Sequence, residues 1–579
     1  MRPMILAFAL TMAATMTSAE PAVDTTPADL ILTDAHIKSP SGWARSMAVR
    51  RGVIVAMGDD AAVMPLRGPA TQVVDLHSNV VLPGFSDVHV HPLGAGLSEL
   101  QCKIAQGSSL AATQDAVKKC AASLESPADW VVGGQWDVPA LGRTPDRKAL
   151  DAVVSGHPII LDDTSGHSAW VNTRALEVAG ITRSTVDPPG GIIERDRRGE
   201  PTGILRESAT DLVRRHVPKL SDDTLRKALA WSLKQMLQVG ITSYTEAAVG
   251  YAAGAERELQ TYAYLADAGK IKQRATLCIT WAPGDAEGQR AITMRNLFAR
   301  DRVSPDCVKI FLDGVPTDSH TAAMLQPYAQ RMRDRNDEAA VRGMLLVDQK
   351  VLNEAVTRFD LMGLTVKFHA AGDAAVRAGL NAIQAARTAN GFSGLMHNVG
   401  HCTFVSKDDL ARARSIGATF EVSPYLWAPS PINDSITAAV GGDLIKRVWP
   451  VREMIDSGAL VVPGSDWAVV PSVNPWIAIE TLVTREVPGG SPTSFGKAEA
   501  ISLPEAIDLF TVNSARQERM SNVVGQLDPG MAADLIVVDQ NPYDVPAARL
   551  HDTHVKMTFI AGEKVFDSTA DAGASRTPP

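Results

Sequence analysis

Short apolar runs alternate with amphipathic stretches through the middle of the chain. Eight runs have the length and the bounding turn residues of β-strands, and helical patterns such as 222–239, 351–362 and 376–389 separate them. The strand candidates are 80–91, 240–246, 274–281, 307–313, 364–370, 396–401, 417–423 and 459–466. Eight strands in alternation with helices predict an α/β fold, the (β/α)8 TIM barrel.

The two ends of the chain show a different pattern. Residues 20–80 contain short apolar runs broken by turn residues, and a similar stretch returns in residues 523–579 before a polar tail. We expect one small β-sandwich built from both ends, with a large barrel at 81–500 and a connecting helix at 501–522. Residues 92–239 are too long for a loop after the first barrel strand, so they predict an inserted subdomain.

The first residues, 1–19, have the features of a secretory signal peptide. A basic start is followed by the apolar run 4–16 and by small residues that end at Ala19. The alternative is an N-terminal membrane anchor, but the run is short for a span of about 20 residues. We therefore expect a periplasmic or secreted protein with no membrane span in the mature chain.

Composition narrows the class of partner. The 579 residues carry a net charge of −9 without a block of Lys or Arg, which disfavours nucleic acid, and the 45% hydrophobic content indicates a globular chain. A small-molecule substrate is the expected partner, and a homo-oligomer stays open. Export allows a disulfide between Cys102 and Cys120, whereas Cys278 and Cys307 lie in apolar strands and are expected to be buried, inert thiols.

Histidines gather at the ends of the predicted barrel strands. They are His89 and His91 on the first strand, His369 at the end of the fifth, and His397 and His401 on the sixth, with Asp466 ending the eighth. Residues two apart on a strand face the same way, so His89 and His91 enter the barrel mouth together. A single histidine at a strand end is usually structural. Imidazoles and a carboxylate from four strands at the mouth of one barrel instead predict a metal site.

Lys309 lies inside an otherwise apolar strand. A bare ammonium in a barrel interior costs several kcal/mol, so the charge needs a partner or a modification. One reading is a buried ion pair with Asp313, four residues further on. The other is that the neutral amine has taken up carbon dioxide, and that the resulting carbamate bridges two metal ions.

With these residues the chain resembles the metal-dependent amidohydrolase superfamily, specifically its YtcJ-like branch (amidohydrolase family 3). The resemblance covers nearly the whole chain after the signal peptide. Its motifs are LPGFSDVHVH at 82–91, HSAWVN at 167–172, KIFLDG at 309–314, HAAGD at 369–373, GSDW at 464–467 and GQLDPG at 525–530.

The resemblance implies an exported enzyme that hydrolyses an amide or related C–N bond by a metal-activated hydroxide. It implies two divalent metal ions, with zinc as the expected metal. In this pattern His89 and His91 bind the first ion, His369 and His401 bind the second, carboxylated Lys309 bridges both, and Asp466 completes the first site and moves the proton. The insertion is expected to shape the substrate pocket, and the candidates to line it are His167, Trp136, Trp170 and Trp427. The alternative is core packing for each Trp, and a structural hydrogen bond to a turn for His167.

One position departs from the family pattern. The family often has a glutamate directly before the second histidine of the sixth strand, where this chain has Gly400. This change weakens any transfer of a substrate from relatives. A lactonase, an esterase or a deaminase would use the same site residues, and a non-catalytic regulatory or binding protein on the same scaffold is a further alternative.

Overall fold

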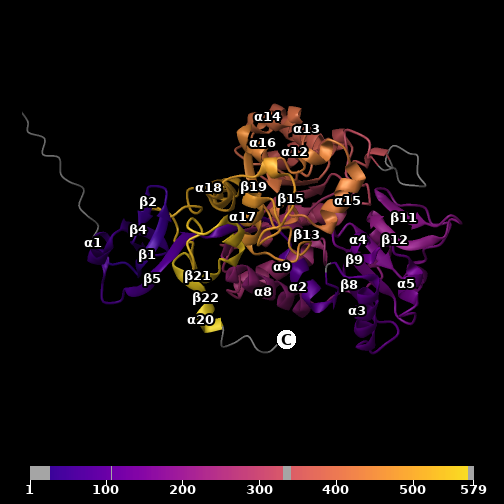
Figure 1. Ribbon diagram of the computed structural model, residues 1–579, viewed down its shortest axis with the longest axis horizontal. Coiled ribbons are helices and arrows are strands. Elements are labelled where there is room, and N and C mark those ends of the chain that lie inside the picture. The colour runs from indigo at the N-terminus through magenta and orange to yellow at the C-terminus, as the bar shows by residue number, and fades with distance from the viewer. Residues whose placement is uncertain (1–25, 106, 330–340, 572–579) are drawn as a thin grey trace, which may run out of the picture.

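The computed structural model describes residues 26–105, 107–329 and 341–571. The predicted signal peptide, residues 1–19, lies outside these ranges. Figure 1 shows three parts in a row: a β domain that joins the two ends of the chain, a central barrel, and an inserted subdomain on the far side. Within the described residues, no helix combines the length and the apolar character that crossing a membrane requires.

The central sheet confirms the predicted barrel. Its eight strands are hydrogen-bonded to one another in chain order, and every neighbouring pair is parallel. The strands are β6 (Phe85–Val90), β13 (Ile241–Val249), β14 (Arg274–Thr280), β15 (Val303–Phe311), β16 (Thr365–Ala370), β17 (Asn398–His401), β18 (Thr419–Val422) and β19 (Leu460–Pro463). At the seam between the last strand and the first, the Asp466 N–H donates to the His89 carbonyl over 2.7 Å.

Helices cover the outside of this sheet, which explains the continuous apolar runs of its strands. All nine residues of β13 are buried, as expected for a parallel strand with both faces covered. The main helices are α8 (Asp222–Gln238), α9 (Ala255–Asp267), α10 (Ala286–Met294), α12 (Gln349–Leu361), α13 (Asp373–Asn390), α14 (Lys407–Ile416), α16 (Val451–Asp456) and α17 (Pro475–Thr484). The barrel therefore has a packed apolar wall.

The predicted first strand, 80–91, is divided between two sheets. Residues up to Pro83 belong to β5 (Gln72–Pro83) in the terminal β domain, and β6 starts at Phe85. Gly84 forms the junction, and its N–H donates to the Asp534 carbonyl. A Cβ at Gly84 would lie 2.3 Å from the Thr242 hydroxyl oxygen, so the two chain segments approach too closely for any side chain.

Both chain ends build one sheet. Its hydrogen-bonded path runs β22-β21-β20-β5-β1-β3-β4, with β2 paired to β1. Residues of both ends meet in one apolar core, as Leu32 and Val81 pack with Leu535 and Phe559. The strands are β1 (Leu30–Ser39), β2 (Gly42–Ala44), β3 (Ser46–Arg50), β4 (Val53–Gly58), β20 (Leu535–Val538), β21 (Val555–Ile560) and β22 (Glu563–Asp567). Between β20 and the barrel lie α18 (Leu503–Asp508), a π-turn and α19 (Ser514–Gln517).

The inserted subdomain has its own six-stranded sheet, in the order β11-β12-β10-β9-β8-β7. Its strands are β7 (Cys102–Lys103), β8 (Val131–Trp136), β9 (Ile159–Asp163), β10 (Ser168–Val171), β11 (Gly191–Arg195) and β12 (Pro201–Glu207). A disulfide between Cys102 and Cys120 ties β7 to α3 (Leu110–Ala122), as the sequence allowed. The insertion therefore has a core and a covalent staple of its own.

The expectation of inert thiols at Cys278 and Cys307 is wrong, because these two residues form a second disulfide. The register of the parallel strands β14 and β15 places them directly beside each other. Spacing along the sequence does not reveal this register. Cys402, buried, is the free cysteine of the described residues.

Candidate metal centre

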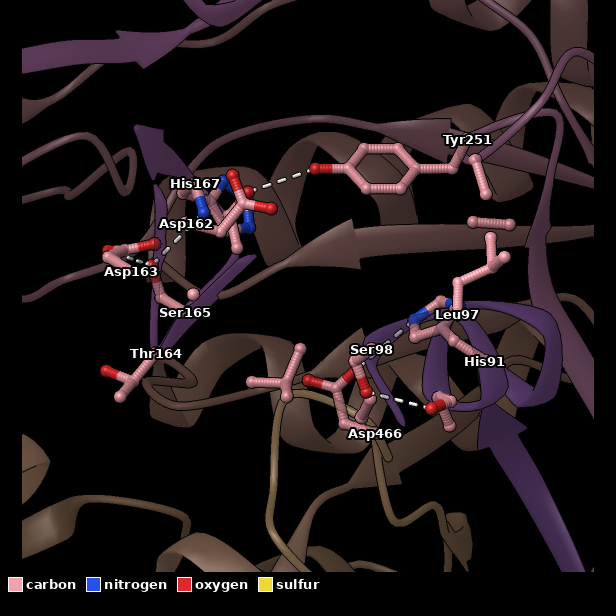
Figure 2. A pocket seen from close by; sticks show the side chains of 18 of the residues that line it. His91, Leu97, Ser98, Asp162, Asp163, Thr164, Ser165, His167, Tyr251 and Asp466 are labelled. Carbon is pink, nitrogen blue, oxygen red and sulfur yellow. Dashed lines mark hydrogen bonds and ion pairs between the residues drawn. The ribbon is translucent and has the colours of Figure 1, made fainter. Parts of the chain in front are cut away.

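A cavity of about 1980 Å³ lies between the barrel mouth and the inserted subdomain. Figure 2 shows its two walls, with His91 and Asp466 on the barrel side, and Asp163 and His167 on the side of the insertion. The predicted residues His89, Lys309, His369 and His401 also line this cavity. The structure thus brings all six predicted ligands to the C-terminal ends of the barrel strands.

Three of the predicted ligands, His89, His91 and Asp466, lie around one point. Asp466 Oδ1 lies 3.3 Å from His91 Nε2 and 3.6 Å from His89 Nε2. Ligand atoms of a tetrahedral ion with bonds of about 2.1 Å are separated by about 3.4 Å. The spacing of His89, His91 and Asp466 therefore fits a divalent ion among them.

The second pair lies directly beside the first. The ring centroids of His369 and His401 are 4.4 Å apart, and His401 is 4.7 Å from His89. His401 Nδ1 lies 3.9 Å from Asp466 Oδ2, so this carboxylate faces both pairs. The two histidine pairs thus form one continuous cluster around Asp466.

Backbone conformation at the rim of this cluster is unusual. His401 and Asp466 have φ values of +71° and +61°, in the left-handed region that side chains other than glycine rarely adopt. Strain of this kind often collects at functional sites. Here it turns both side chains into the barrel mouth at the point where their strands end.

Three of the histidines have a carboxylate within hydrogen-bond distance of their Nδ1 atoms. Glu421 Oε1 lies 2.5 Å from His89 Nδ1, and Glu246 Oε1 lies 3.2 Å from His91 Nδ1. Asp313 Oδ1 lies 3.1 Å from His369 Nδ1. An acceptor at Nδ1 places the ring proton there and leaves the lone pair on Nε2, which is the usual arrangement of metal-bound histidines.

Sequence reasoning missed the carboxylates Glu421 and Glu246 as site residues. Both lie in apolar strands and are buried, so the argument that singled out Lys309 applies to them as well. The strand pattern could have found them. It could not have told which histidine each one holds, because that depends on the stagger between strands.

Burial sets the protonation of most of the cluster. It holds the pKa values of His89, His369 and His401 well below the usual range, with neighbouring cations adding to the effect. Neutral imidazoles are the form that binds metal. For His91 burial also lowers the pKa, but hydrogen bonds to Asp466 and Glu246 outweigh it and raise the value to about 9.

Lys309 is buried and unpaired within the described part of the chain. Its side chain is 1% exposed, and its nitrogen lies 4.9 Å from the centroid of the Phe311 ring. No described residue forms a hydrogen bond or ion pair with that nitrogen. Burial, together with the nearby Lys367 ammonium, lowers the pKa of Lys309 to about 7. A large fraction of this amine is therefore neutral near pH 7.

The alternative pairing of Lys309 with Asp313 is not formed. Asp313 instead accepts backbone N–H groups from Ala323, Ala371 and Gly372, besides facing His369. It follows the end of β15, so the alternation of side chains along the strand does not extend to it. The ion-pair reading of Lys309 is thus contradicted.

The carboxylate that pairs with a second buried lysine, Lys367, lies beside Gly400. Lys367 Nζ forms an ion pair with Glu421 and donates to the Val88 carbonyl over 2.9 Å. A Cβ at Gly400 would lie 3.0 Å from Glu421 Oε2 and 2.7 Å from the Phe368 carbonyl. Glu421 on the neighbouring strand therefore occupies the space beside Gly400.

The predicted tryptophans lie in cores rather than on the cavity wall. Trp136 and Trp170 are buried in the insertion, where their indole N–H groups donate to the carbonyls of Leu161 and Asp146. Trp427 is buried against Trp449. Large aromatic side chains are mostly buried in folded proteins, and this tendency accounts for the core location of all three tryptophans.

Other aromatic residues line the cavity instead. They are Trp130, Trp231, Trp281, Trp449, Trp467, Phe311 and Tyr251. Tyr251 also bridges the two walls, because its hydroxyl donates to the Gly166 carbonyl of the insertion (Figure 2). No local motif distinguishes these aromatic residues from those of the core.

His167 does lie on the cavity wall, as predicted, and pairs with Glu207. Arg485 is buried, stacks on Trp427 and donates to the Phe495 carbonyl, away from the cavity. His397 is also remote from the cluster, and its ring bonds to Asp360.

Comparisons with known proteins agree with this architecture. The chain is 28% identical over 527 residues to the protein YtcJ of Bacillus subtilis, covering 90% of this chain and 96% of that protein. It is 24% identical over 576 residues to the N-substituted formamide deformylase of Arthrobacter pascens, covering 93% and 99%. A solved structure of an uncharacterized metal-dependent hydrolase from Pyrococcus horikoshii shares the fold, with 22% identity, coverage of 90% and 99%, and a TM-score of 0.69. Residues 72–566 match the model of the amidohydrolase family, and the chain belongs to this family.

Proposed function

We propose that the protein hydrolyses an amide or related C–N bond with two divalent metal ions, of which zinc is the expected metal. The observation that carries the proposal is the convergence of His89, His91, His369, His401 and Asp466 around buried Lys309. The donor set fits such ions: three Nδ1 atoms rest on carboxylates, and the ligand atoms around Asp466 have tetrahedral spacing.

The residues of this chain have separate parts in the reaction. Bound divalent ions supply a Lewis acid and lower the pKa of water to about 7. Asp466 faces both histidine pairs, so its carboxylate is placed to accept the proton of the attacking water and to deliver it to the leaving nitrogen. Carboxylated Lys309 would place an anion between the two pairs, and this charge would offset the two cations.

The cavity and one relative support the proposed substrate class. The wall is rich in aromatic side chains, which suits an apolar substituent on the substrate. The similarity to an N-substituted formamide deformylase supports a C–N bond of an N-substituted amide. The same site residues could hydrolyse esters and lactones, so the substrate screen includes both classes.

A substrate screen tests the proposal. Purified protein reconstituted with zinc is assayed against panels of N-aryl and N-benzyl amides, esters, lactones and aminopurines, beside Asp466→Ala. The exposed Asp443→Ala serves as the matched control. We expect amide hydrolysis that Asp443→Ala keeps and Asp466→Ala loses. Turnover of esters or lactones alone would contradict the C–N assignment, and turnover of nothing would favour a binding protein.

We also propose that the protein is exported. The predicted signal peptide supports this, as do the disulfides Cys102–Cys120 and Cys278–Cys307, which persist in oxidising compartments. Expressed in a bacterium with its own N-terminus, the protein is expected in the periplasm with Glu20 as its first residue. N-terminal sequencing that returned Met1 from the soluble periplasmic fraction would contradict this proposal.

A further inference from the structure

A series of aromatic rings leads from the predicted metal ligands to the inserted subdomain. The Phe311 ring stacks on His369, with ring centroids 5.6 Å apart and ring planes at 29°, and the Lys309 nitrogen lies 4.9 Å from the Phe311 centroid. The Tyr251 ring comes next, 6.4 Å from Phe311 and tilted by 32°. Its hydroxyl donates to the Gly166 carbonyl of the insertion over 3.0 Å (Figure 2). Phe311 and Tyr251 both line the cavity, so two rings extend the site outward from His369.

Both rings are held in place by their surroundings. Phe311 is the last residue of β15, where the register of the sheet places it beside His369. Tyr251 lies in the loop between β13 and α9. The buried Glu258 carboxylate accepts backbone N–H groups from three residues of this loop, Gly250, Ala252 and Ala253. Because its hydroxyl is bonded as well, Tyr251 is fixed at both ends. A surface that is ordered before binding loses little conformational entropy when a ligand arrives.

The accessible part of this series is apolar. Tyr251 is 61% exposed, and it offers its ring to a ligand, since the hydroxyl proton is already used in the bond to Gly166. Exposed aromatic surface inside a cavity is typical of a ligand-binding wall. Flat rings pack on aromatic side chains in offset or edge-on geometry and gain energy beyond the area that they bury. The Phe311 and Tyr251 rings therefore suit a flat aromatic group better than a saturated one.

We propose that Phe311 and Tyr251 form a specificity subsite for an aromatic ring of the substrate. This inference rests on the proposed function, because the stacking of Phe311 on His369 places the subsite beside the bond that would be cleaved. The ring can belong to the acyl group or to the substituent on the nitrogen, and both present the same chemistry to the two side chains. The experiment below separates these two sources.

Binding of small product-like molecules tests the subsite without requiring turnover. Calorimetry on the full chain with added zinc measures two pairs of probes: benzoate and cyclohexanecarboxylate for the acyl side, and benzylamine and cyclohexylmethylamine for the amine side. The variants are Phe311→Leu, Tyr251→Leu and Tyr251→Phe. The matched control is Tyr264→Leu, because the Tyr264 ring is exposed on α9 and lies under Arg226, outside the cavity wall. Near-UV circular dichroism of each variant checks the fold.

In one of the two pairs we expect wild type and the control to bind the phenyl probe at least about threefold more tightly than the cyclohexyl probe. The pair that shows this preference identifies the side of the substrate that carries the ring. Phe311→Leu and Tyr251→Leu should each lower the affinity ratio by about half or more. Tyr251→Phe keeps the ring and loses the bond to Gly166, so its ratio should stay above that of Tyr251→Leu. The two Tyr251 variants keep the test decisive if Phe311→Leu does not fold.

Two results would overturn the subsite. One is equal affinity of wild type for the phenyl and cyclohexyl probes in both pairs. The other is a phenyl preference that persists unchanged in Phe311→Leu and Tyr251→Leu. Failure of the proposed function looks different: a phenyl preference that depends on Tyr251, in a protein that hydrolyses no amide, would support the subsite and refute the reaction.

Discussion

At the scale of single residues, the site is characterised by three charged side chains that are buried in barrel strands. Lys309, Lys367 and Glu421 are buried in strands, where an unpaired charge is costly. Lys367 and Glu421 compensate each other, and Lys309 has no such partner among the described residues. The histidines of the cluster were predictable because strands alternate their side chains, whereas the carboxylates at their Nδ1 atoms depend on contacts between strands.

Replacement of Lys309 tests its bridging role. Lys309→Ala is expected to fold, to bind fewer than two metal ions and to lose about a thousandfold or more in kcat/KM, because the site loses several kcal/mol of electrostatic stabilisation. A short carboxylic acid in solution should restore part of the activity by filling the space of the carbamate. Elemental analysis and steady-state kinetics measure both effects.

The control for this variant is Lys270→Ala at an exposed position. Normal metal content and activity in Lys309→Ala would rule out the bridge.

Removal of the Glu421 charge has two expected effects. In Glu421→Gln the Lys367 ammonium stays buried without its counter-charge, which should lower the free energy of unfolding by about 3 to 5 kcal/mol. The weaker acceptor at His89 should also reduce metal affinity by about 10- to 100-fold. Chemical denaturation and zinc competition titrations separate the two effects. Wild-type zinc affinity would show that Glu421 does not position His89.

At the scale of elements, the strands were predicted better than their connections. Eight barrel strands were recognised because each is a short apolar run between turns, and helical patterns separated them. The split at Gly84 was missed because residues 80–90 are buried without a break across the end of β5 and the whole of β6, and only the close approach of Thr242 reveals the junction. The Cys278–Cys307 bond was missed because strand register is a property of the folded sheet.

One buried carboxylate joins three elements and should make stability depend on pH. Asp360 on α12 accepts bonds from Arg387 of α13, from Ser393 and from His397 beside β17. Burial raises its pKa, but the hydrogen bonds from His397, Ser393 and Asn390 outweigh this and hold the pKa well below 3.8. A depressed pKa contributes stability that is complete above the unfolded value near 4 and is lost as the pH falls toward the folded value.

Asp360→Asn should therefore be less stable than wild type at pH 7, and the difference should shrink below about pH 4. Thermal unfolding of both proteins from pH 3 to pH 7 measures it. A difference that stayed constant down to pH 3 would show that Asp360 is not ionised through these contacts.

At the scale of the whole molecule, the insertion is fastened over the barrel mouth. Arg206 of β12 forms ion pairs with Glu194 in the insertion and with Asp318 in the segment after β15. Gln135 donates to the Ala468 carbonyl beside Asp466. The existence of an insertion was predictable from its length. Its docking was not, because the Arg206–Asp318 and Gln135–Ala468 contacts join residues 112 and 333 positions apart.

Loss of the Arg206 link should loosen the insertion. Arg206→Met is expected to increase amide hydrogen exchange in β9, β10 and β12, and to raise KM more than it lowers kcat, because the substrate wall moves while Asp466 stays. Arg174→Met, which removes an exposed ion pair with Glu177 of the same subdomain, is the control. Unchanged exchange in these strands would contradict the fastening role.

The sheet that joins both ends of the chain also sets an order of assembly. Strand β5 lies between β1 and β20, and Leu535 pairs with Pro83 about 450 residues after β5 has left the ribosome. At synthesis rates of 5 to 20 residues per second, this edge of β5 waits about 20 to 90 s for its partner. An open apolar strand edge is prone to aggregate. A nascent chain that stops before Leu535 thus exposes such an edge, and its survival until release depends on being shielded.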